Sequence, residues 1–158
     1  MMQLSPAGIL LIQGSEGFMP KAYWDVNAYS IGYGTHLDTP QLVNLYLHAT
    51  ITEEQGKELM MPKIQASENN INLNVKVPLT QNQFDALVDF TYNLGIGSLD
   101  GSTLLKLLNE KNYIGAAGQF TLWDHENGKE NLYLKSRREK EQSLFLTKDE
   151  IPVSSSKN

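Results

Sequence analysis

Hydrophobic positions recur at helical spacing over most of this chain. The first such segment begins where Ser5 precedes Pro6, a typical helix start. It should end near Glu16, because Gly17 suits the position after a helix C-terminus. Further helices are predicted over residues 39–48, 80–94, 112–123 and about 132–146, with others beginning at 52 and 102.

Two of these helices begin with a capping box, in which a threonine is followed three positions later by a glutamine. One runs from Thr52 to Gln55 and the other from Thr80 to Gln83. Pro62 falls inside the first of these helices, and we expect a kink or an early break there.

Helical spacing is absent between residues 22 and 37, where aromatic residues and glycines alternate as in short strands and turns. The pattern predicts an α+β fold with one domain over 1–146. Residues 1–65 would form a small mixed lobe, and residues 73–146 a helical lobe with a ligand cleft between the two. The polar tail 147–158 is expected to be disordered.

Composition narrows the classes of function. A net charge of −5 over 158 residues argues against a nucleic-acid partner, since phosphate neutralisation needs a basic surface. There are no cysteines, and His36, His48 and His125 follow no metal-ligand spacing, so we expect neither metal nor cofactor. The apolar run 7–14 is too short to span a bilayer, which predicts a soluble, cytoplasmic protein without membrane insertion. We also expect a monomer.

The candidate chemistry lies in two carboxylates from different elements. Glu16 ends a helix, beside the negative end of the helix dipole, which disfavours ionisation. Asp25 follows in a turn region, with the Ser30 hydroxyl close behind it. Two carboxylates held across a groove are what hydrolysis of a glycosidic bond requires.

The spacing of these residues resembles the phage lysozymes, the muramidases of glycoside hydrolase family 24. Glu16 and Asp25 are nine positions apart, and Ser30-Ile-Gly-Tyr-Gly34 follows. Family-like segments continue in family order to the end of the last helix: Pro78-Leu-Thr-Gln-Asn-Gln-Phe-Asp-Ala-Leu-Val88, Tyr92-Asn-Leu-Gly95, Ser102-Thr-Leu-Leu105, Gln119-Phe120 with Trp123, and Arg137-Arg138 with Glu141 and Leu144-Phe145. The resemblance covers roughly residues 3–146 and implies a lysozyme-like fold.

The resemblance implies an endolysin that cleaves the β-1,4 bond between N-acetylmuramic acid and N-acetylglucosamine in bacterial peptidoglycan, with inversion. Glu16 would be the general acid, Asp25 would activate or position water, and Ser30 would hold that water. The two carboxyl groups should then lie roughly 6.5–9.5 Å apart. Such an enzyme waits in the host cytoplasm until a separate pore-forming protein releases it to the wall.

Three features depart from the family pattern. Asp25 and Ser30 are five positions apart, one fewer than usual, and Ser30 stands where the family has threonine. Thr35 intervenes between the glycine turn and His36. Many relatives are basic, whereas this chain is acidic.

Five further residues are candidate substrate contacts. For His36 the alternative is a structural or solvated role, for Tyr92 and Trp123 it is packing, and Asn93 is a candidate hydrogen-bond partner of sugar. These candidates are Tyr33, His36, Tyr92, Asn93 and Trp123.

The Arg137-Arg138 pair allows three interpretations. It binds anionic wall, it pairs with a carboxylate of the cleft, or Arg138 contacts Glu141 on a solvated helix face. The last of these is slightly favoured.

Two rival functions remain open. A catalytically impaired, glycan-binding or structural relative would fit the shortened turn and the acidic charge. The other is a different chitin- or wall-directed glycosidase, or a transglycosylase that needs only Glu16.

Overall fold

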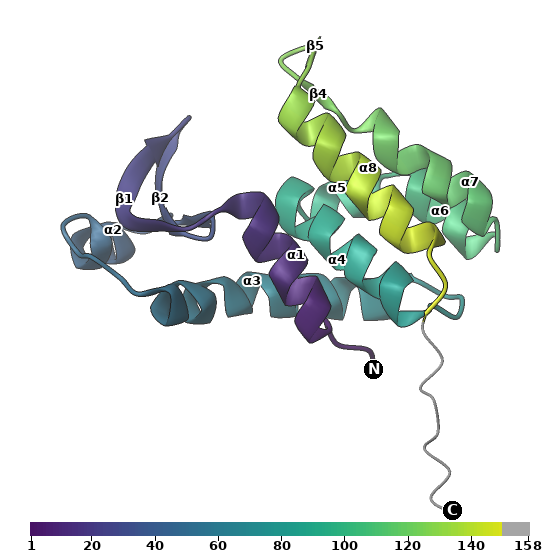
Figure 1. The fold of residues 1–158 in the computed structure, drawn as a ribbon, viewed down its shortest axis with the longest axis horizontal. Coiled ribbons are helices and arrows are strands. Elements are labelled where there is room, and N and C mark those ends of the chain that lie inside the picture. Colours follow the sequence, from purple (N-terminus) through teal and green to yellow (C-terminus); the bar gives the residue numbers. More distant parts are fainter. Residues whose placement is uncertain (150–158) are drawn as a thin grey trace, which may run out of the picture.

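The computed structural model describes residues 1–149, which form two lobes joined by one long helix (Figure 1). The helices are α1 (Pro6–Glu16), α2 (Pro40–Tyr46), α3 (Glu53–Asn74), α4 (Gln81–Leu94), α5 (Ile96–Asp100), α6 (Thr103–Asn109), α7 (Tyr113–Gln119), a 3₁₀ turn (Phe120–Leu122) and α8 (Leu132–Leu146). The strands are β1 (Met19–Asp25), β2 (Ala28–Gly32), β3 (Thr35–His36), β4 (His125–Glu126) and β5 (Lys129–Glu130). This mixture confirms the predicted α+β class.

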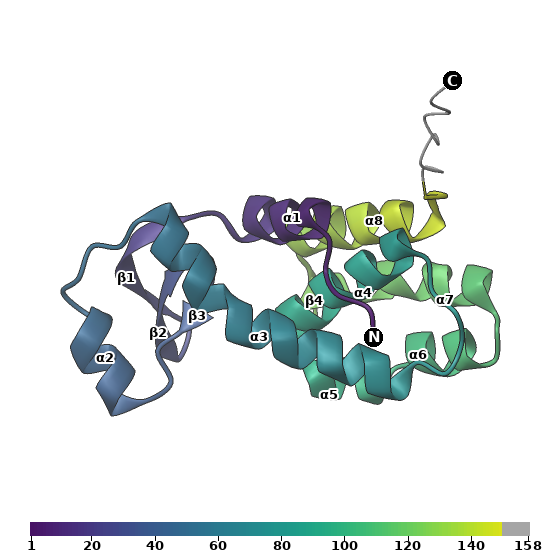
Figure 2. The same cartoon turned by 90° about the horizontal axis from the view of Figure 1, so that it is seen from below.

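The small lobe is built on a three-stranded antiparallel sheet in the order β1-β2-β3. The sheet packs on α2 and α3 through a small apolar cluster around Ile31, Leu37 and Ile51. Seen from below, α3 runs from this sheet into the helical lobe (Figure 2). The linking helix therefore sets the relative position of the two lobes.

Local capping explains most helix boundaries. Ser5 accepts a hydrogen bond from the Gly8 backbone, and α1 ends at Glu16, with Gly17 at a φ of 71°. Both predicted capping boxes are present, at Thr52 and at Thr80. The expected early break at Pro62 is wrong, because α3 continues through this residue to Asn74.

The helical lobe is centred on α4. All nine residues from Phe84 to Tyr92 are buried, so this helix is enclosed on every side. Phe90 packs edge-on against Phe120 and Trp123, at centroid separations of 5.5 and 5.6 Å. A helix in this central position can carry polar side chains only where other buried groups bind them.

The first residues of the tail are ordered. The Asp149 carboxylate accepts hydrogen bonds from the backbone N–H of Gln81 (2.8 Å) and of Asn82 (3.0 Å), at the start of α4. The expected disorder over 147–158 is thus wrong for 147–149, and its remainder lies outside the described residues.

Candidate active site

Glu16 lies at the point where α1 leaves the helical lobe and the chain enters the sheet. Its side chain is 17% exposed, and Oε1 accepts a hydrogen bond of 2.7 Å from Arg137 Nη1. The other oxygen, Oε2, lies against Gly34, where a Cβ atom would approach it to 2.6 Å. Gly34 also has a φ of 73°, so both its backbone and its neighbour require glycine.

Asp25 is the last residue of β1, and a tight turn through Val26 and Asn27 leads into β2. Directly opposed residues of an antiparallel pair share one face of the sheet. The pairs Tyr23–Ser30, Asp25–Ala28 and Ser30–His36 therefore place five side chains on one face.

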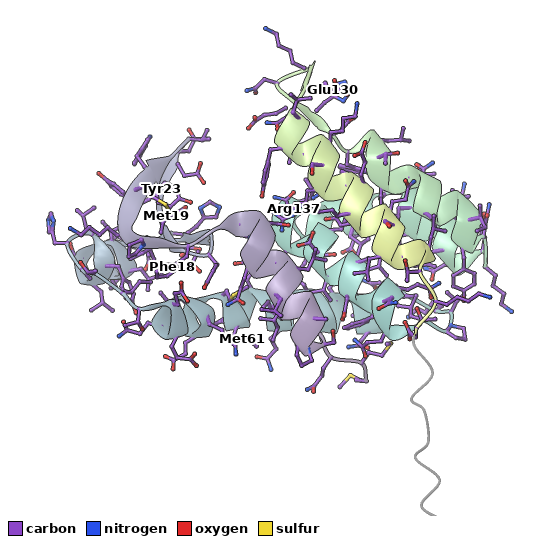
Figure 3. The ribbon with its side chains drawn as sticks, in the orientation of Figure 1. Phe18, Met19, Tyr23, Met61, Glu130 and Arg137 are labelled. Atoms are coloured by element: carbon purple, nitrogen blue, oxygen red, sulfur yellow. The ribbon has the colours of Figure 1, made fainter. Side chains whose placement is uncertain are left out.

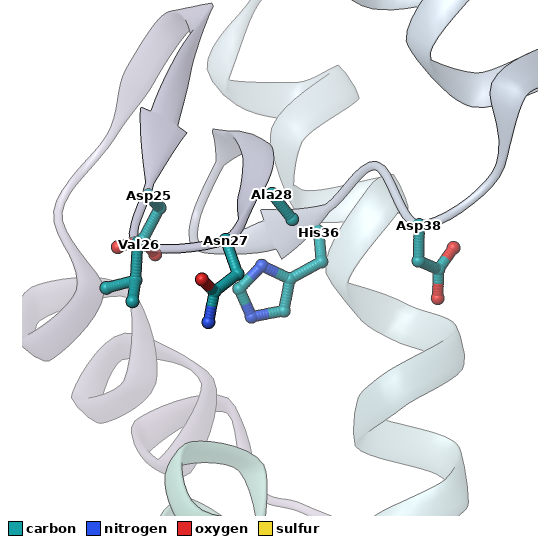
Figure 4. A pocket seen from close by; sticks show the side chains of 6 residues that line it. All are labelled: Asp25, Val26, Asn27, Ala28, His36 and Asp38. Carbon is teal, nitrogen blue, oxygen red and sulfur yellow. The ribbon is translucent and has the colours of Figure 1, made fainter.

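This face borders a groove of about 500 Å³. Asp25 and Asp38 lie on either side of the His36 ring, which is exposed at the groove (Figure 4). The groove is lined by Asp25, Val26, Asn27, Ala28, His36 and Asp38.

The Ser30 hydroxyl is fully buried and lies 2.8 Å from His36 Nδ1. Ser30 and Asp25 are diagonal neighbours on the sheet face, an arrangement that separates Cβ atoms by about 7–8 Å. The shortened turn thus keeps Ser30 on the same face as Asp25, with its hydroxyl bound to His36.

Tyr23 lies on the same sheet face as Asp25, and the charge of Glu16 also acts on it. Burial raises the pKa of its phenol, and the negative charges of Asp25 and Glu16 raise it further. Its hydroxyl also lies beside that of Ser30. Tyr23 therefore interacts with all three predicted catalytic side chains: with Glu16 and Asp25 through their charges, and with Ser30 through its hydroxyl.

Arg137 lies on α8, in the helical lobe (Figure 3). From there it binds Glu16. Its guanidinium also makes two hydrogen bonds to Asp89 of α4, at 2.8 and 3.1 Å. Nη1 further donates to the Tyr133 hydroxyl, which in turn donates to the Ser15 backbone oxygen. Burial opposes the charge of Arg137, but the hydrogen bonds and charges of Asp89 and Glu16 outweigh burial and raise its pKa.

The arginine pair is not on a solvated face. Arg137, Arg138 and Glu141 are each at most 2% exposed, because α8 packs this side against α4. The predicted contact of Arg138 with Glu141 is present at 3.0 Å, but its predicted place on a solvated face is wrong. Arg137 pairs with Glu16.

The other candidate substrate residues are placed in different environments. Tyr33 and Tyr92 are buried in the core, and the Tyr92 hydroxyl donates to the Tyr33 backbone oxygen at 2.8 Å. Trp123 is half-buried against Phe90. Asn93 is half-buried and accepts a hydrogen bond of 2.6 Å from Arg138. Among these four, Asn93 and Trp123 are the more accessible to a sugar.

Sequence reasoning missed Tyr23, Asp89 and Tyr133. Tyr23 was detectable, since it lies two positions before Asp25 and strand alternation puts both on one face. Asp89 was detectable as a charge within the apolar stretch of α4. No local signal marks Tyr133, because its contact with Ser15 spans 118 positions.

Comparison with known proteins gives concordant matches. The family model described as phage lysozyme matches residues 13–141. The endolysin of Bacillus phage B103 is 41% identical over 156 residues, which cover 97% of this chain and 57% of that protein. The endolysin of Salmonella phage P22 is 39% identical over 150 residues, covering 93% of this chain and all of that protein. The chain therefore spans little more than half the length of its Bacillus phage relative.

Solved structures agree with the sequence matches. The muramidase domain of SpmX from Asticaccaulis excentricus superposes with a TM-score of 0.84 at 33% identity, covering 94% of this chain and 100% of that one. A P22 lysozyme mutant superposes with a TM-score of 0.80 at 38% identity, covering 93% and 100%. The lysozyme-like fold is confirmed.

Proposed function

Because the chain belongs to the phage lysozyme family, we propose that it is an endolysin-type lysozyme. Its substrate is peptidoglycan, and the bond cleaved is the β-1,4 linkage between N-acetylmuramic acid and N-acetylglucosamine. One observation carries this proposal: Glu16 ends α1, Asp25 ends β1 at the hairpin, and the negative charges of both raise the pKa of the half-buried Tyr23 phenol beyond the effect of its burial.

Glu16 is the general acid in this mechanism. Since Arg137 binds Oε1, Oε2 is the oxygen that carries the proton to the leaving glycosidic oxygen. Gly34 leaves the space next to Oε2 that a side chain would fill. Positioned proton transfer of this kind contributes about 10²–10⁴-fold to a rate.

Asp25 acts on the opposite sugar face. As a carboxylate it takes a proton from the water that attacks the anomeric carbon, while the bond to the leaving oxygen breaks. One water is consumed, and the configuration is inverted. Ser30, oriented by His36, helps to hold that water, and Asn93 and Trp123 bind sugar from the helical lobe.

Delivery to the wall belongs to the same proposal. No helix within residues 1–149 is long and apolar enough to cross a membrane. The protein accumulates in the host cytoplasm and reaches peptidoglycan when a separate pore-forming protein opens the membrane. Expression in cells should leave them intact until the membrane is permeabilised; lysis without permeabilisation would contradict this route.

A turbidity assay on purified cell walls tests the activity. The parent protein should clear the suspension, and Glu16→Gln should not. Glu139→Gln is the matched control, because Glu139 is exposed on α8 and its substitution removes the same charge. A folded parent protein that binds walls without clearing them would favour the non-catalytic alternative.

Asp25→Asn separates hydrolysis from transglycosylation. A hydrolase that activates water through Asp25 loses most activity on this substitution, whereas a transglycosylase needs only Glu16. Full activity of a folded Asp25→Asn variant would contradict the proposed mechanism.

A further inference from the structure

The contact between α4 and α8 buries four ionisable side chains next to Glu16. Asp89, Arg137, Arg138 and Glu141 are each between 0 and 2% exposed. Only Glu16, at 17%, reaches the solvent side of this cluster. Burying so much charge is costly unless the charges balance within the cluster.

Glu141 is the member whose interactions are incomplete. Its Oε2 is 3.0 Å from Arg138 Nε, and its Oε1 is 4.0 Å from Arg137 Nε. Neither contact has hydrogen-bond direction, so both carboxyl oxygens are buried without a hydrogen-bond donor among the described residues. The negative charge of Asp89 also acts on the Glu141 carboxyl. A like charge nearby disfavours ionisation of a carboxyl.

Counting charges shows how the cluster balances. Arg137 and Arg138 supply two positive charges, because guanidinium groups stay protonated in proteins. Three carboxyls face them, and Asp89 is held ionised by its two hydrogen bonds to Arg137. Among these five side chains, one proton on either Glu16 or Glu141 brings the net charge to zero.

We propose that Glu16 and Glu141 share this one proton, which makes Glu141 a positioning residue that controls how readily Glu16 is protonated. With the proton on Glu141, Glu16 is an anion paired to Arg137. With the proton on Glu16, Glu141 is an anion paired to Arg138. The net charge of the cluster is the same in both states, and Arg137 and Asp89 connect the two sites.

The titration behaviour of the cluster supports this coupling. Burial raises the pKa of Glu141 well above its ordinary value, and the adjacent Asp89 raises it further, against the opposing charges of both arginines. Burial opposes the charge of Asp89, but the hydrogen bonds and charge of Arg137 outweigh burial, so the pKa of Asp89 is lowered. Groups that interact this strongly titrate together.

Other titratable groups face Glu16 from the surrounding elements. Burial raises the pKa of Tyr23 on β1, Tyr92 on α4 and Tyr133 on α8, so all three phenols are uncharged near neutrality. Lys63 on α3 is the one additional cation acting on Glu16 among residues 1–149. It is half-buried over the Tyr92 ring, where water screens its charge, and it does not face Glu141.

This inference rests on the proposed function, because it assigns a purpose to Glu16 protonation. A lysozyme needs Glu16 protonated at the pH where Asp25 is ionised. When Glu16 takes up the proton, its buried partner Glu141 becomes an anion. This exchange stabilises protonated Glu16. Replacing Glu141 with a permanently neutral residue removes this partner, so that protonation of Glu16 is no longer balanced by a new anion.

Carboxyl ¹³C NMR of glutamate-labelled protein tests the coupling without any activity measurement. In the parent, Glu141 should remain protonated near neutral pH. In Glu16→Gln, one negative charge is lost from the cluster, so the Glu141 midpoint should move about one pH unit lower. Glu139→Gln should leave it unmoved. An identical Glu141 midpoint in parent and Glu16→Gln would overturn the proposal, as would an ionised Glu141 near neutrality in the parent.

The pH profile of wall lysis gives the reciprocal readout. In Glu141→Gln the alkaline limb of kcat/KM should move about one unit lower, a roughly tenfold loss on that limb. Glu139→Gln should keep the parent profile, and an unshifted profile in folded Glu141→Gln would refute the coupling. If Glu141→Gln does not fold, the NMR comparison still decides, with Glu141 assigned by its proximity to Arg138. A parent protein without lysis would refute the proposed function, whereas the NMR result bears on the coupling alone.

Discussion

Arg137 Nη1 lies 2.7 Å from Glu16 Oε1, which joins side chains separated by 121 positions. The contact brings the start of the fold to its last helix, and it fixes the carboxylate on which the proposed chemistry depends. Arg137 is itself held by Asp89, so the position of Glu16 is determined by the packing of α8 on α4.

Removing the Arg137 side chain should lower the free energy of unfolding. Arg137→Met leaves Asp89 buried with an uncompensated charge, which typically costs about 3–5 kcal/mol. Urea denaturation of parent and variant measures the difference. The double variant Arg137→Met/Asp89→Leu should recover most of the loss, and a double variant no more stable than Arg137→Met would contradict this explanation.

Gly34→Ala should reduce lysis without abolishing folding. The added methyl group would meet Glu16 Oε2, and the backbone φ of 73° is unfavourable for alanine. A displacement of about 1 Å at a reacting group can cost on the order of 10²-fold in rate. Gly118→Ala is the control, since Gly118 is exposed in α7 with free space around it. It should keep full activity and gain about 0.5–1 kcal/mol; equal activity of the two variants would refute the role of Gly34.

The stability of Glu141→Gln should depend on pH in a defined direction. The raised pKa means that the folded parent keeps a proton that the unfolded chain releases above about pH 4.5. Parent stability therefore falls as pH rises from that value towards the folded-state pKa, by up to about 1.4 kcal/mol per unit. The variant lacks this loss, so its stability relative to the parent should increase over the same interval. Unfolding free energies at several pH values measure the trend, and a constant difference would contradict it.

Asp149→Asn should weaken the start of α4. The carboxylate accepts from two backbone N–H groups at the positive end of the helix dipole, an interaction worth about 1 kcal/mol. Thermal unfolding at low and high salt measures the loss, which should shrink at high salt as the charge is screened. An unchanged melting temperature at low salt would show that this cap contributes nothing.

How much of the fold could be predicted from the sequence depends on how far apart in the chain the interacting residues lie. The starts of α1, α3 and α4 were predictable because each is capped by a side chain at most three positions away. The β4–β5 hairpin was missed, although Asn127-Gly128 is a typical hairpin turn with positive φ at both residues. Its strands have two residues each and are fully exposed, so no hydrophobic alternation marks them.

The candidate site shows the same limit. Glu16, Asp25 and Ser30 were selected from one short segment, and the structure places Asp25 and Ser30 on one face of the sheet. The error over Arg138 and Glu141 has a physical origin, because charges three positions apart look alike on a solvated and on a buried helix face. Only the packing of α4 against α8 distinguishes the two, and this contact is not local in sequence.

The most direct test of the central claim is the release of reducing ends from purified peptidoglycan by the parent protein and by folded Glu16→Gln. We predict that the parent generates reducing N-acetylmuramic acid ends and that Glu16→Gln does not. Equal release by both proteins, or parent products that lack reducing ends, would contradict a hydrolase with Glu16 as its general acid.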